Sequence, residues 1–313
     1  MTLAGRAGIA PAVQYERDRN HRGGLRGGGR VCAGTGGVPV ERGIGNDSVH
    51  GGGSGVAVRG LTREDFRVFD NGARRTVDDL WVDTDLPLTL GVLIDASESQ
   101  QEQIEEHRRT ARELMARILR PGDQAFVISV AEDIRLWTDL DRAPGELFGE
   151  PCPKQPSSAS GVRAISVCGS SPLWNAIYEA ARVKLRPVKG NRSLLILTDG
   201  FDSGSTHTWR EAVDEAHKAD ATVYAVQYRS SGGAKYAPDL YRLVAEAGGT
   251  WFEAPGGEYD AIVSRLETDL RRRYVLGFRP EKLSGKVRHE LRVEVARPEL
   301  SVRARKAYYR VEE

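Results

Sequence analysis

Three oxygen-bearing side chains, Asp95, Ser97 and Ser99, follow the apolar run 88–94 at alternate positions. Carboxylate and hydroxyl oxygens are ligands that a hard divalent cation accepts, and a curled loop turns alternate side chains toward one point. Asp and Ser that precede a helix are also ordinary N-cap residues, which accept hydrogen bonds from free backbone N–H groups. The D-x-S-x-S pattern by itself is therefore compatible with a cation site and with a helix cap.

Two further stretches place oxygen atoms beside predicted elements. The run 194–198 leads directly into Asp199, which repeats the strand-then-acid pattern of the first stretch. A loop of small polar residues leads into another predicted helix, where Ser171 suits an N-cap and Pro172 suits the first helical position. These stretches supply a second carboxylate and another hydroxyl for the same site.

The elements that must position these side chains alternate between strand and helix. Continuous apolar runs with β-branched residues predict buried strands, and apolar stripes at helical spacing predict helices. The predicted strands cover 88–95, 125–130, 134–140, 194–199, 221–227 and 249–254, and the predicted helices cover 101–119, 173–183, 207–219, 239–247 and 259–272. This order is typical of an α/β, doubly wound, Rossmann-like parallel sheet, in which ligands collect beyond the carboxyl ends of the strands. The short connection before 134–140 predicts one antiparallel edge strand.

The segments on either side of this domain predict a small β unit. The turn Asp70-Asn71-Gly72 lies between two short runs of strand character and predicts a β-hairpin. The runs 274–278, 289–296 and 302–309 alternate in steps of two, and we expect them to form one sheet with the hairpin because neither part has enough strands alone. The predicted organisation is a disordered Gly/Arg-rich tail over 1–60, a hairpin flank over 61–86, the α/β domain over 87–273 and a C-terminal β unit over 274–313.

Composition bears on partners and on the compartment. The 45 Lys and Arg residues balance 44 Asp and Glu residues to a net charge of +1, which does not call for a nucleic acid or an anionic membrane as partner. No apolar run reaches the ~18 residues of a transmembrane helix, and residues 1–60 lack the apolar centre of a signal peptide. Cys152 and Cys168 flank a Pro- and Ser-rich loop and are candidates for a disulfide worth roughly 3 kcal/mol, which requires an oxidising compartment.

Together, Asp95-x-Ser97-x-Ser99, the Ser171 loop and Thr198-Asp199-Gly200 resemble the metal-ion-dependent adhesion site of von Willebrand factor type A (VWFA) domains. The flanks LTREDFRVFDNG and YVLGFRP…VRARKAYY are similar to those of bacterial, chiefly acidobacterial, VWFA-related proteins, so that the resemblance covers residues 61–310. It implies a protein-binding module rather than an enzyme, and a periplasmic or secreted location.

The resemblance also implies a role for each site residue. Ser97 and Ser99 would bind the cation through their hydroxyls, and Asp95 and Asp199 would hold it directly or through water. Ser171 stands where the family usually has threonine, so a hydroxyl is kept. Mg²⁺ suits such a site, with Mn²⁺ or Ca²⁺ as substitutes, and a carboxylate of a protein partner fills the open coordination position.

Glu98 and Asp202 lie near these residues in the sequence. They are candidates for positions at the rim or behind the ligands, although acids of this kind are more often simply solvated.

Two alternatives stay open from the sequence. One is a VWFA scaffold whose metal site is vacant and whose partner binds elsewhere. The other is a magnesium-dependent hydrolase or phosphatase, because strand-end aspartates with magnesium also serve phosphoryl transfer. The sequence has no Gly-rich phosphate loop with Lys and no G-x-S-x-G elbow. His107 and His217 are expected on solvated helix faces, which leaves His207 as the histidine to test. The sequence names neither the partner nor the oligomeric state.

Overall fold

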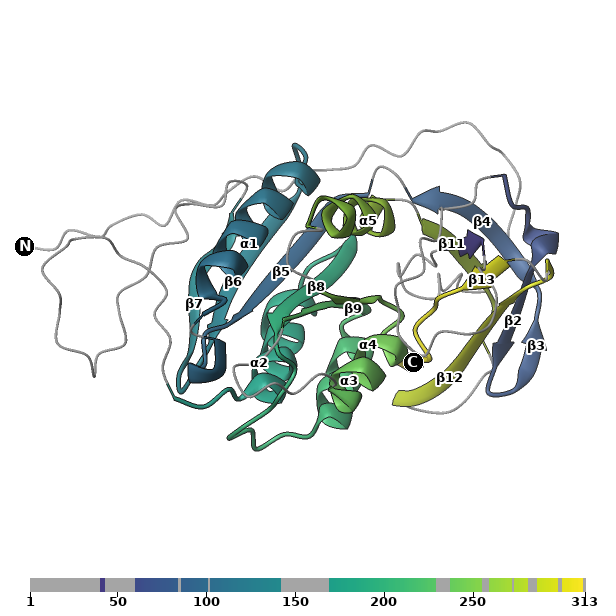
Figure 1. The fold of residues 1–313 in the computed structure, drawn as a ribbon. Helices are drawn as coiled ribbons and strands as arrows, with labels where there is room; N and C mark the ends of the chain where they lie inside the picture. The colour runs from purple at the N-terminus through teal and green to yellow at the C-terminus, as the bar shows by residue number, and fades with distance from the viewer. Residues whose placement is uncertain are drawn as a thin grey trace, which may run out of the picture. The chain divides into compact units, whose positions relative to one another are not determined.

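A computed structural model describes residues 40–42, 60–83, 86–100, 102–141, 169–228, 237–254, 259–271, 273–280, 286–297 and 300–311 (Figure 1). Its central element is a six-stranded sheet in the order β10-β9-β8-β5-β6-β7. The strands are β5 (Leu88–Asp95), β6 (Gln124–Val130), β7 (Ile134–Asp141), β8 (Asn191–Thr198), β9 (Ala221–Gln227) and β10 (Trp251–Glu253). Neighbouring strands are parallel except for β7, which runs antiparallel to β6 at the edge. The prediction of a doubly wound sheet with one antiparallel edge strand is confirmed.

Helices cover both faces of this sheet (Figure 1). One face carries α1 (Ile104–Ile118) and α5 (Tyr259–Arg271), and the other carries α2 (Leu173–Glu179), α3 (Trp209–Lys218) and α4 (Pro238–Glu246). Because side chains alternate along a strand, β5 contributes to a separate apolar core on each face. The same strand is buried over its whole length, which is why its sequence reads as a continuous apolar run.

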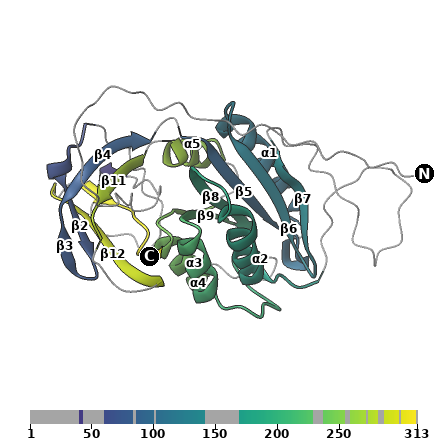
Figure 2. The same ribbon diagram turned by 180° about the vertical axis from the view of Figure 1, so that it is seen from behind.

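Figure 2 shows from behind that β8, β5 and β6 lie side by side, with β7 next to β6 at the edge of the sheet. Gly91 of β5 makes this packing fit, since a Cβ atom there would lie 2.3 Å from the Phe126 ring. A larger residue at this position would require the side chains of Phe126 and Leu194 to shift.

The helix predicted over 173–183 changes its winding part of the way along. After α2 the chain forms the π-helical segment η3 (Ala180–Leu185), in which the amide of Arg186 bonds to the carbonyl of Ala181. The wider turn rotates the following side chains around the helix axis. Val183, predicted to lie in the buried stripe, is consequently 54% exposed.

In the described residues the flanking segments form two antiparallel sheets of their own, while β13 (Leu300–Val302) pairs with a strand outside them, so the prediction of a single sheet is wrong. Their elements are η1 (Arg63–Asp65), β2 (Phe66–Asp70), β3 (Ala73–Arg75), β4 (Val77–Asp83), β11 (Arg273–Phe278), β12 (Lys286–Val295), β13 and β14 (Ala307–Val311). The sheet orders are β14-β12-β2-β3 and β11-β4. The predicted hairpin of β2 and β3 is present, with positive φ at Asn71 and Gly72. β4 leaves the hairpin and pairs with β11, and the two sheets share one apolar core, because a sheet with one apolar face must bury it against another layer.

Some predictions fall largely or wholly outside the described residues. Cys152 and Cys168 lie there, as does most of the tail over 1–60. Within that tail the structure describes the short strand β1 (Val40–Arg42), which pairs antiparallel with β13. None of the helices in the described part of the chain has the length and apolar character that crossing a membrane requires.

Candidate functional site

The candidate site lies where the winding of the sheet reverses. β5 and β8 are neighbours at the centre of the sheet, and the helices that follow them, α1 and α3, pack on opposite faces. Side chains after the carboxyl ends of two such strands line a crevice, which is the usual ligand position in this architecture. Asp95 ends β5, and Asp199 directly follows β8. The fold therefore brings together two acids that are 104 positions apart in the sequence.

A continuous chain of short contacts joins the predicted ligands. The Ser97 hydroxyl donates to Asp95 Oδ1 over 2.6 Å, and the Ser97 and Ser99 hydroxyl oxygens are 3.2 Å apart. The Ser99 hydroxyl in turn donates to Asp199 Oδ2 over 2.7 Å. The turn η2 (Glu98–Gln100) curls the loop so that the alternate side chains face one another. Four of the five predicted site residues thus form one connected group.

The oxygen spacing in this group fits a small divalent cation. Adjacent ligands of an octahedral Mg²⁺ at roughly 2.0–2.1 Å lie about 2.9 Å from each other. The contacts of 2.6, 3.2 and 2.7 Å between Asp95, Ser97, Ser99 and Asp199 bracket that spacing. The donor set of carboxylates and hydroxyls is hard oxygen throughout, as Mg²⁺, Mn²⁺ and Ca²⁺ prefer.

Asp95 is fully buried, and its surroundings oppose its charge. Burial, as the largest cause, raises the pKa of this carboxyl to about 6, and the charge of Asp199 acts in the same direction. Hydrogen bonds from Ser97 and Thr198 oppose the rise, with the Thr198 hydroxyl 2.5 Å from Asp95 Oδ2. The Thr198 oxygen also accepts the amide of Gly200 over 2.9 Å. Thr198 therefore fixes the orientation of Asp95 relative to the loop that carries Asp199.

Asp199 is 1% exposed and is held by neutral donors. Gln100 donates its side-chain amide to Oδ2 over 2.9 Å, and the Phe201 backbone amide donates to Oδ1 over 3.0 Å. Neither Gln100 nor the hydrogen bond from Thr198 was predicted from the sequence. Only the proximity of Thr198 to Asp199 gave a signal, because the contacts of Gln100 depend on the fold of the turn.

No basic side chain neutralises these acids within the described residues. Asp95 and Asp199 make no ion pair there, and the closest histidine contact, from His107 Nδ1, is to the backbone carbonyl of Asp95 over 3.2 Å. In the same ranges no group of three or more His, Cys, Asp or Glu side chains is placed to hold a metal ion. The site consists instead of two buried carboxylates and the hydroxyls beside them, and a buried charge without a counter-charge is costly.

Ser171 occupies a neighbouring loop, and its predicted role as a helix cap is wrong. α2 begins at Leu173, with Pro172 before the first helical residue. The Ser171 hydroxyl is buried and has no hydrogen-bond partner among the residues that the structure describes. Its loop adjoins the Asp95 loop, since the Glu98 amide donates to the Gly169 carbonyl over 3.3 Å. A buried hydroxyl left without a partner at this position is consistent with a ligand atom.

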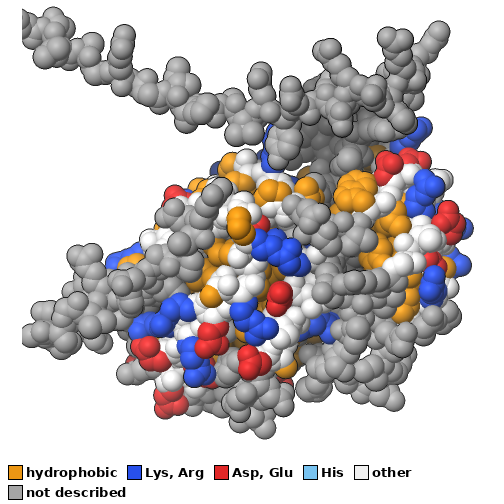
Figure 3. All heavy atoms as spheres, turned by 90° about the horizontal axis from the view of Figure 1, so that it is seen from above, with side chains coloured by type: hydrophobic (Ala, Val, Ile, Leu, Met, Phe, Trp, Pro, Cys, Tyr) orange, Lys and Arg blue, Asp and Glu red, His pale blue; other side chains and the backbone are white. Residues whose placement is uncertain are grey.

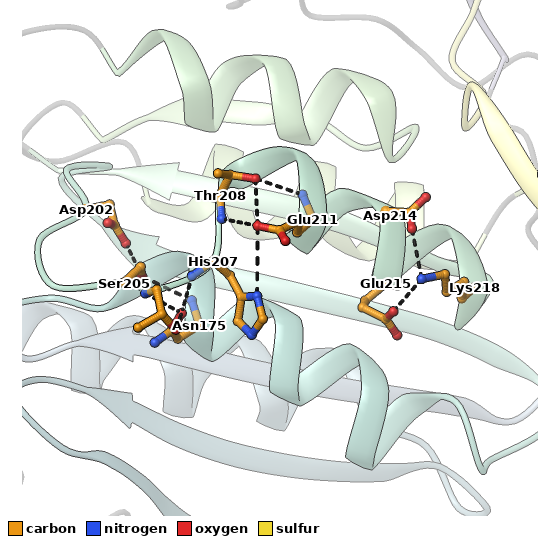
Figure 4. Close-up of polar contacts among 10 residues, drawn as sticks. Asn175, Asp202, Ser205, His207, Thr208, Glu211, Asp214, Glu215 and Lys218 are labelled. Carbon is orange, nitrogen blue, oxygen red and sulfur yellow. Dashed lines mark hydrogen bonds and ion pairs between the residues drawn. The ribbon is translucent and has the colours of Figure 1, made fainter.

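Asp202 performs the capping that was predicted for Ser171. Its Oδ1 accepts the backbone amide of Trp174 in the first turn of α2 over 3.0 Å, and the Ser205 hydroxyl over 2.5 Å. Asn175 Oδ1 binds the same 202–208 loop by accepting the amide of His207 over 2.9 Å (Figure 4). Asp202 therefore connects the first turn of α2 to the loop before α3 through its hydrogen bonds. Glu98, by contrast, has an exposed side chain at the rim.

The histidines differ from expectation. His107 and His217, predicted on solvated helix faces, are 0% and 2% exposed, and burial as the largest cause lowers their pKa to about 3 and about 4. α1 and α3 are covered by more of the chain than their sequence pattern indicates. His207 stacks on Tyr178 at 3.8 Å between ring centroids and faces Glu211 (Figure 4). The histidine that a hydrolase would need therefore has partners other than the two site acids.

Comparison with known proteins finds similarity in structure but not in sequence. No family model matches the chain, and no curated protein matches it in sequence. A solved structure of proximal thread matrix protein 1 from the mussel byssus, with a zinc-occupied MIDAS motif, is similar at 13% identity and a TM-score of 0.47, covering 65% of this chain and 50% of that one. This chain thus spans about half the length of the mussel protein.

Two bacterial structures are similar at the same level. An aerotolerance-related membrane protein from Bacteroides fragilis has 16% identity and a TM-score of 0.40, with 59% of this chain and 98% of that chain covered. The pilus adhesin SpaC from Lactobacillus rhamnosus GG has 12% identity and a TM-score of 0.42, with 66% and 34% covered. All of these similarities are at identities of 16% or less and TM-scores below 0.5.

Proposed function

We propose that the chain is a non-enzymatic protein-binding module that captures a carboxylate of its partner through a divalent cation. The cation would be held by Asp95, Ser97, Ser99, Ser171 and Asp199, and Mg²⁺ suits the all-oxygen ligand set best, with Mn²⁺ or Ca²⁺ as substitutes. The resemblance of the motifs to adhesion-site domains supports this, and also supports a periplasmic or secreted location.

One observation carries the proposal. Asp95 and Asp199 are buried, share a hydroxyl network, and have no Lys, Arg or His side chain as a counter-charge among the described residues. Two buried carboxylates in this state favour uptake of a cation from solution, because the cation removes their mutual repulsion and the cost of their burial.

Each residue of the chain has a distinct task in this proposal. The hydroxyls of Ser97, Ser99 and Ser171 are neutral ligands, so they add oxygen atoms without adding repulsion. Thr198 and Gln100 hold the two carboxylates in place through their hydrogen bonds over 2.5 and 2.9 Å. When bound, the cation supplies positive charge and a coordination position for an oxygen of the partner. Phe201, which is 41% exposed beside Asp199, offers apolar contact area to that partner.

Calorimetry with magnesium tests the cation site. Full-length protein freed of metal with EDTA is titrated with Mg²⁺, alongside the variants Asp199→Asn and Ser99→Ala. The matched control is Asp239→Asn, an acid 47% exposed on α4. We expect saturable binding by the wild type and the control, and loss of most affinity in the two site variants. Absence of binding by the wild type would instead support a scaffold with a vacant site.

Water relaxation with manganese tests carboxylate capture. Protein loaded with Mn²⁺ enhances the relaxation of water protons in exchange with the metal, and a carboxylate that takes a coordination position lowers this enhancement. We expect a short peptide with a central Asp to lower it and the same peptide with Asn to leave it unchanged. Equal effects of the two peptides would contradict capture of a carboxylate. Magnesium-dependent turnover of an aryl phosphate that Asp199→Asn abolishes would favour a hydrolase.

A further inference from the structure

Gln100 is a fully buried side chain directly after the last serine of the D-x-S-x-S loop. Its side-chain nitrogen lies 2.9 Å from Asp199 Oδ2 and 3.2 Å from the Ser99 carbonyl oxygen. Both of these oxygens only accept hydrogen bonds, so the amide must present its NH₂ group to them. Its own carbonyl oxygen, Oε1, is buried without a hydrogen-bond partner among the described residues. Gln100 therefore keeps its amide on Asp199 although its carbonyl stays unsatisfied.

Asp199 has few acceptor positions left for a cation. The two oxygens of a carboxylate offer about four positions in all. Oδ2 accepts the Ser99 hydroxyl over 2.7 Å and the Gln100 amide over 2.9 Å, so both of its positions are taken. Oδ1 accepts the Phe201 backbone amide over 3.0 Å and keeps one position in the described structure. Asp199 can therefore bind a cation through one oxygen but not through both.

Asp95 shows the same arrangement with different donors. Its Oδ1 accepts the Ser97 backbone amide over 3.0 Å and the Ser97 hydroxyl over 2.6 Å, and its Oδ2 accepts the Thr198 hydroxyl over 2.5 Å. One position is left on this carboxylate as well. Each acid thus offers one oxygen, and the other ligands that we propose are the hydroxyls of Ser97, Ser99 and Ser171. The Ser171 hydroxyl is buried and unpartnered in the described part of the chain, which points independently to a ligand here.

This small set of ligands favours one class of cation. It suits the octahedral shell of Mg²⁺ or Mn²⁺, whereas Ca²⁺ takes up to about eight oxygens and often binds both oxygens of a carboxylate. Charge gives no such preference, because Mg²⁺ and Ca²⁺ carry the same charge. Acidic and basic side chains are moreover intermixed on the face drawn in Figure 3. A preference between the cations must therefore come from the ligands and from the residues that hold them.

We propose that Gln100 makes this site selective for Mg²⁺ and Mn²⁺ over Ca²⁺ by holding Asp199 to a single open position. The inference rests on the proposed function, since it concerns the cation of that site. Ser99 bonds to the same oxygen but is itself a proposed ligand, which leaves Gln100 as the residue that closes the position without binding the metal. Without the amide, Asp199 gains a second open position, and Ca²⁺ gains a ligand that Mg²⁺ does not need.

Calorimetry on full-length protein freed of metal with EDTA tests the inference, with Mg²⁺ and Ca²⁺ titrated separately. Gln100→Met removes the amide and keeps an unbranched side chain of similar size. We expect the wild type to bind Mg²⁺ more tightly than Ca²⁺. In the variant the affinity for Mg²⁺ should fall about tenfold, because a residue that orients a ligand is lost. The affinity for Ca²⁺ should stay the same or rise, so the ratio of the two dissociation constants moves about tenfold towards Ca²⁺.

Gln227→Met is the matched control. Gln227 is a buried glutamine that also donates to Asp199, but to its backbone carbonyl oxygen, over 2.7 Å. Its loss leaves the carboxylate oxygens as they are, so both dissociation constants should change by the same factor and the ratio should be kept. Equal losses for both cations in Gln100→Met would overturn the inference, because they would show support of the site without selection. So would a shift of the ratio in Gln227→Met as large as that in Gln100→Met.

A measurement on the wild type does not depend on the folding of a variant. Mn²⁺ bound to the protein is followed by water relaxation while Mg²⁺ or Ca²⁺ is added as a competitor. We expect Mg²⁺ to displace Mn²⁺ at lower concentrations than Ca²⁺ does. Displacement by Ca²⁺ at an equal or lower concentration would overturn the inference and leave the cation site standing. If the wild type binds none of the three cations, the proposed function fails, and the inference that depends on it fails as well.

Discussion

The acids at the two edges of the central sheet have different kinds of partner side chain. At the edge formed by the amino ends of the strands, three described acids that are buried or partly buried are paired with arginine. The pairs are Asp123 with Arg271, Asp220 with Arg192 and Arg305, and Asp269 with Arg265 and Arg303. At the carboxyl edge, Asp95 and Asp199 have serine, threonine and glutamine donors and no basic partner in the described ranges.

This difference indicates which acids are structural. The arginines at the amino edge come partly from the connection between β13 and β14 and partly from α5, so the ion pairs there attach those segments to the sheet. Arg273 at the start of β11 is buried at the same edge and donates to Ser193 and Thr222 over 3.1 Å and to the Tyr224 hydroxyl over 2.8 Å. The chain supplies its own positive charge where acids join segments, whereas the described residues supply none to Asp95 and Asp199, where we propose that a cation binds.

The largest expected effect is at the amino edge. Arg271→Ala leaves the buried Asp123 without its partner and should lower the free energy of unfolding by about 3–5 kcal/mol. Urea denaturation measures this loss, and the slope of the free energy of unfolding against urea concentration should stay unchanged. The double variant Asp123→Asn, Arg271→Met removes both charges and should cost less than Arg271→Ala alone. A larger loss in the double variant would mean that the pair acts mainly through packing.

The equivalent change at the carboxyl edge should behave differently. Asp199→Asn removes one of two like charges, so in EDTA its free energy of unfolding should stay within about 1 kcal/mol of the wild type. Wild-type protein should gain about 2.7 kcal/mol from Mg²⁺ at 100 times the dissociation constant, and the variant should gain almost none. Urea denaturation with and without Mg²⁺ measures both quantities. A loss in EDTA as large as that of Arg271→Ala would remove the contrast between the edges.

Acid should weaken the amino edge through His217. Burial lowers the pKa of this histidine to about 4, with Arg305 and Arg288 lowering it further while Asp214 and the Glu246 carbonyl raise it. In the unfolded state the histidine takes up a proton near its ordinary pKa of 6.5, while in the folded state it stays neutral until the pH approaches 4. Protonation therefore favours the unfolded state increasingly as the pH falls below 6.5. Stability should therefore drop by roughly 2 kcal/mol between pH 7 and pH 5 on account of His217. Thermal unfolding of His217→Gln should show a shallower pH dependence, and an identical slope would contradict this.

The smallest expected effect concerns the unpartnered hydroxyl at the carboxyl edge. Ser171→Ala removes no hydrogen bond in the described structure, so stability in EDTA should change by less than about 0.5 kcal/mol. Affinity for Mg²⁺ should fall about tenfold because one ligand is lost. Ser170→Ala, on the same loop, serves as the control in the same titration. A larger loss of Mg²⁺ affinity in Ser170→Ala than in Ser171→Ala would mean that Ser170, and not Ser171, supplies the ligand oxygen.

Much of the domain could be predicted from the sequence because its strands are buried on both faces. Such strands appear as uninterrupted apolar runs, and the acids at their ends mark the edge where ligands collect. Predictions failed where packing between distant segments decided the outcome. Val183 became exposed through a π-helical turn, Ser171 lost its capping role to Asp202, and β4 paired with β11 rather than joining one sheet with the hairpin.

The sequence alone determined the order of strands and helices and the oxygen-bearing residues that follow two of the strands, because local hydrophobic periodicity and short spacing are enough for both. The tertiary structure decided which of those residues meet. It set Ser99 against Asp199, inserted Gln100 and Thr198 as their supports, and paired the acids of the opposite edge with arginines. The contacts within the site join residues about a hundred positions apart, and their geometry depends on how the sheet and its helices pack.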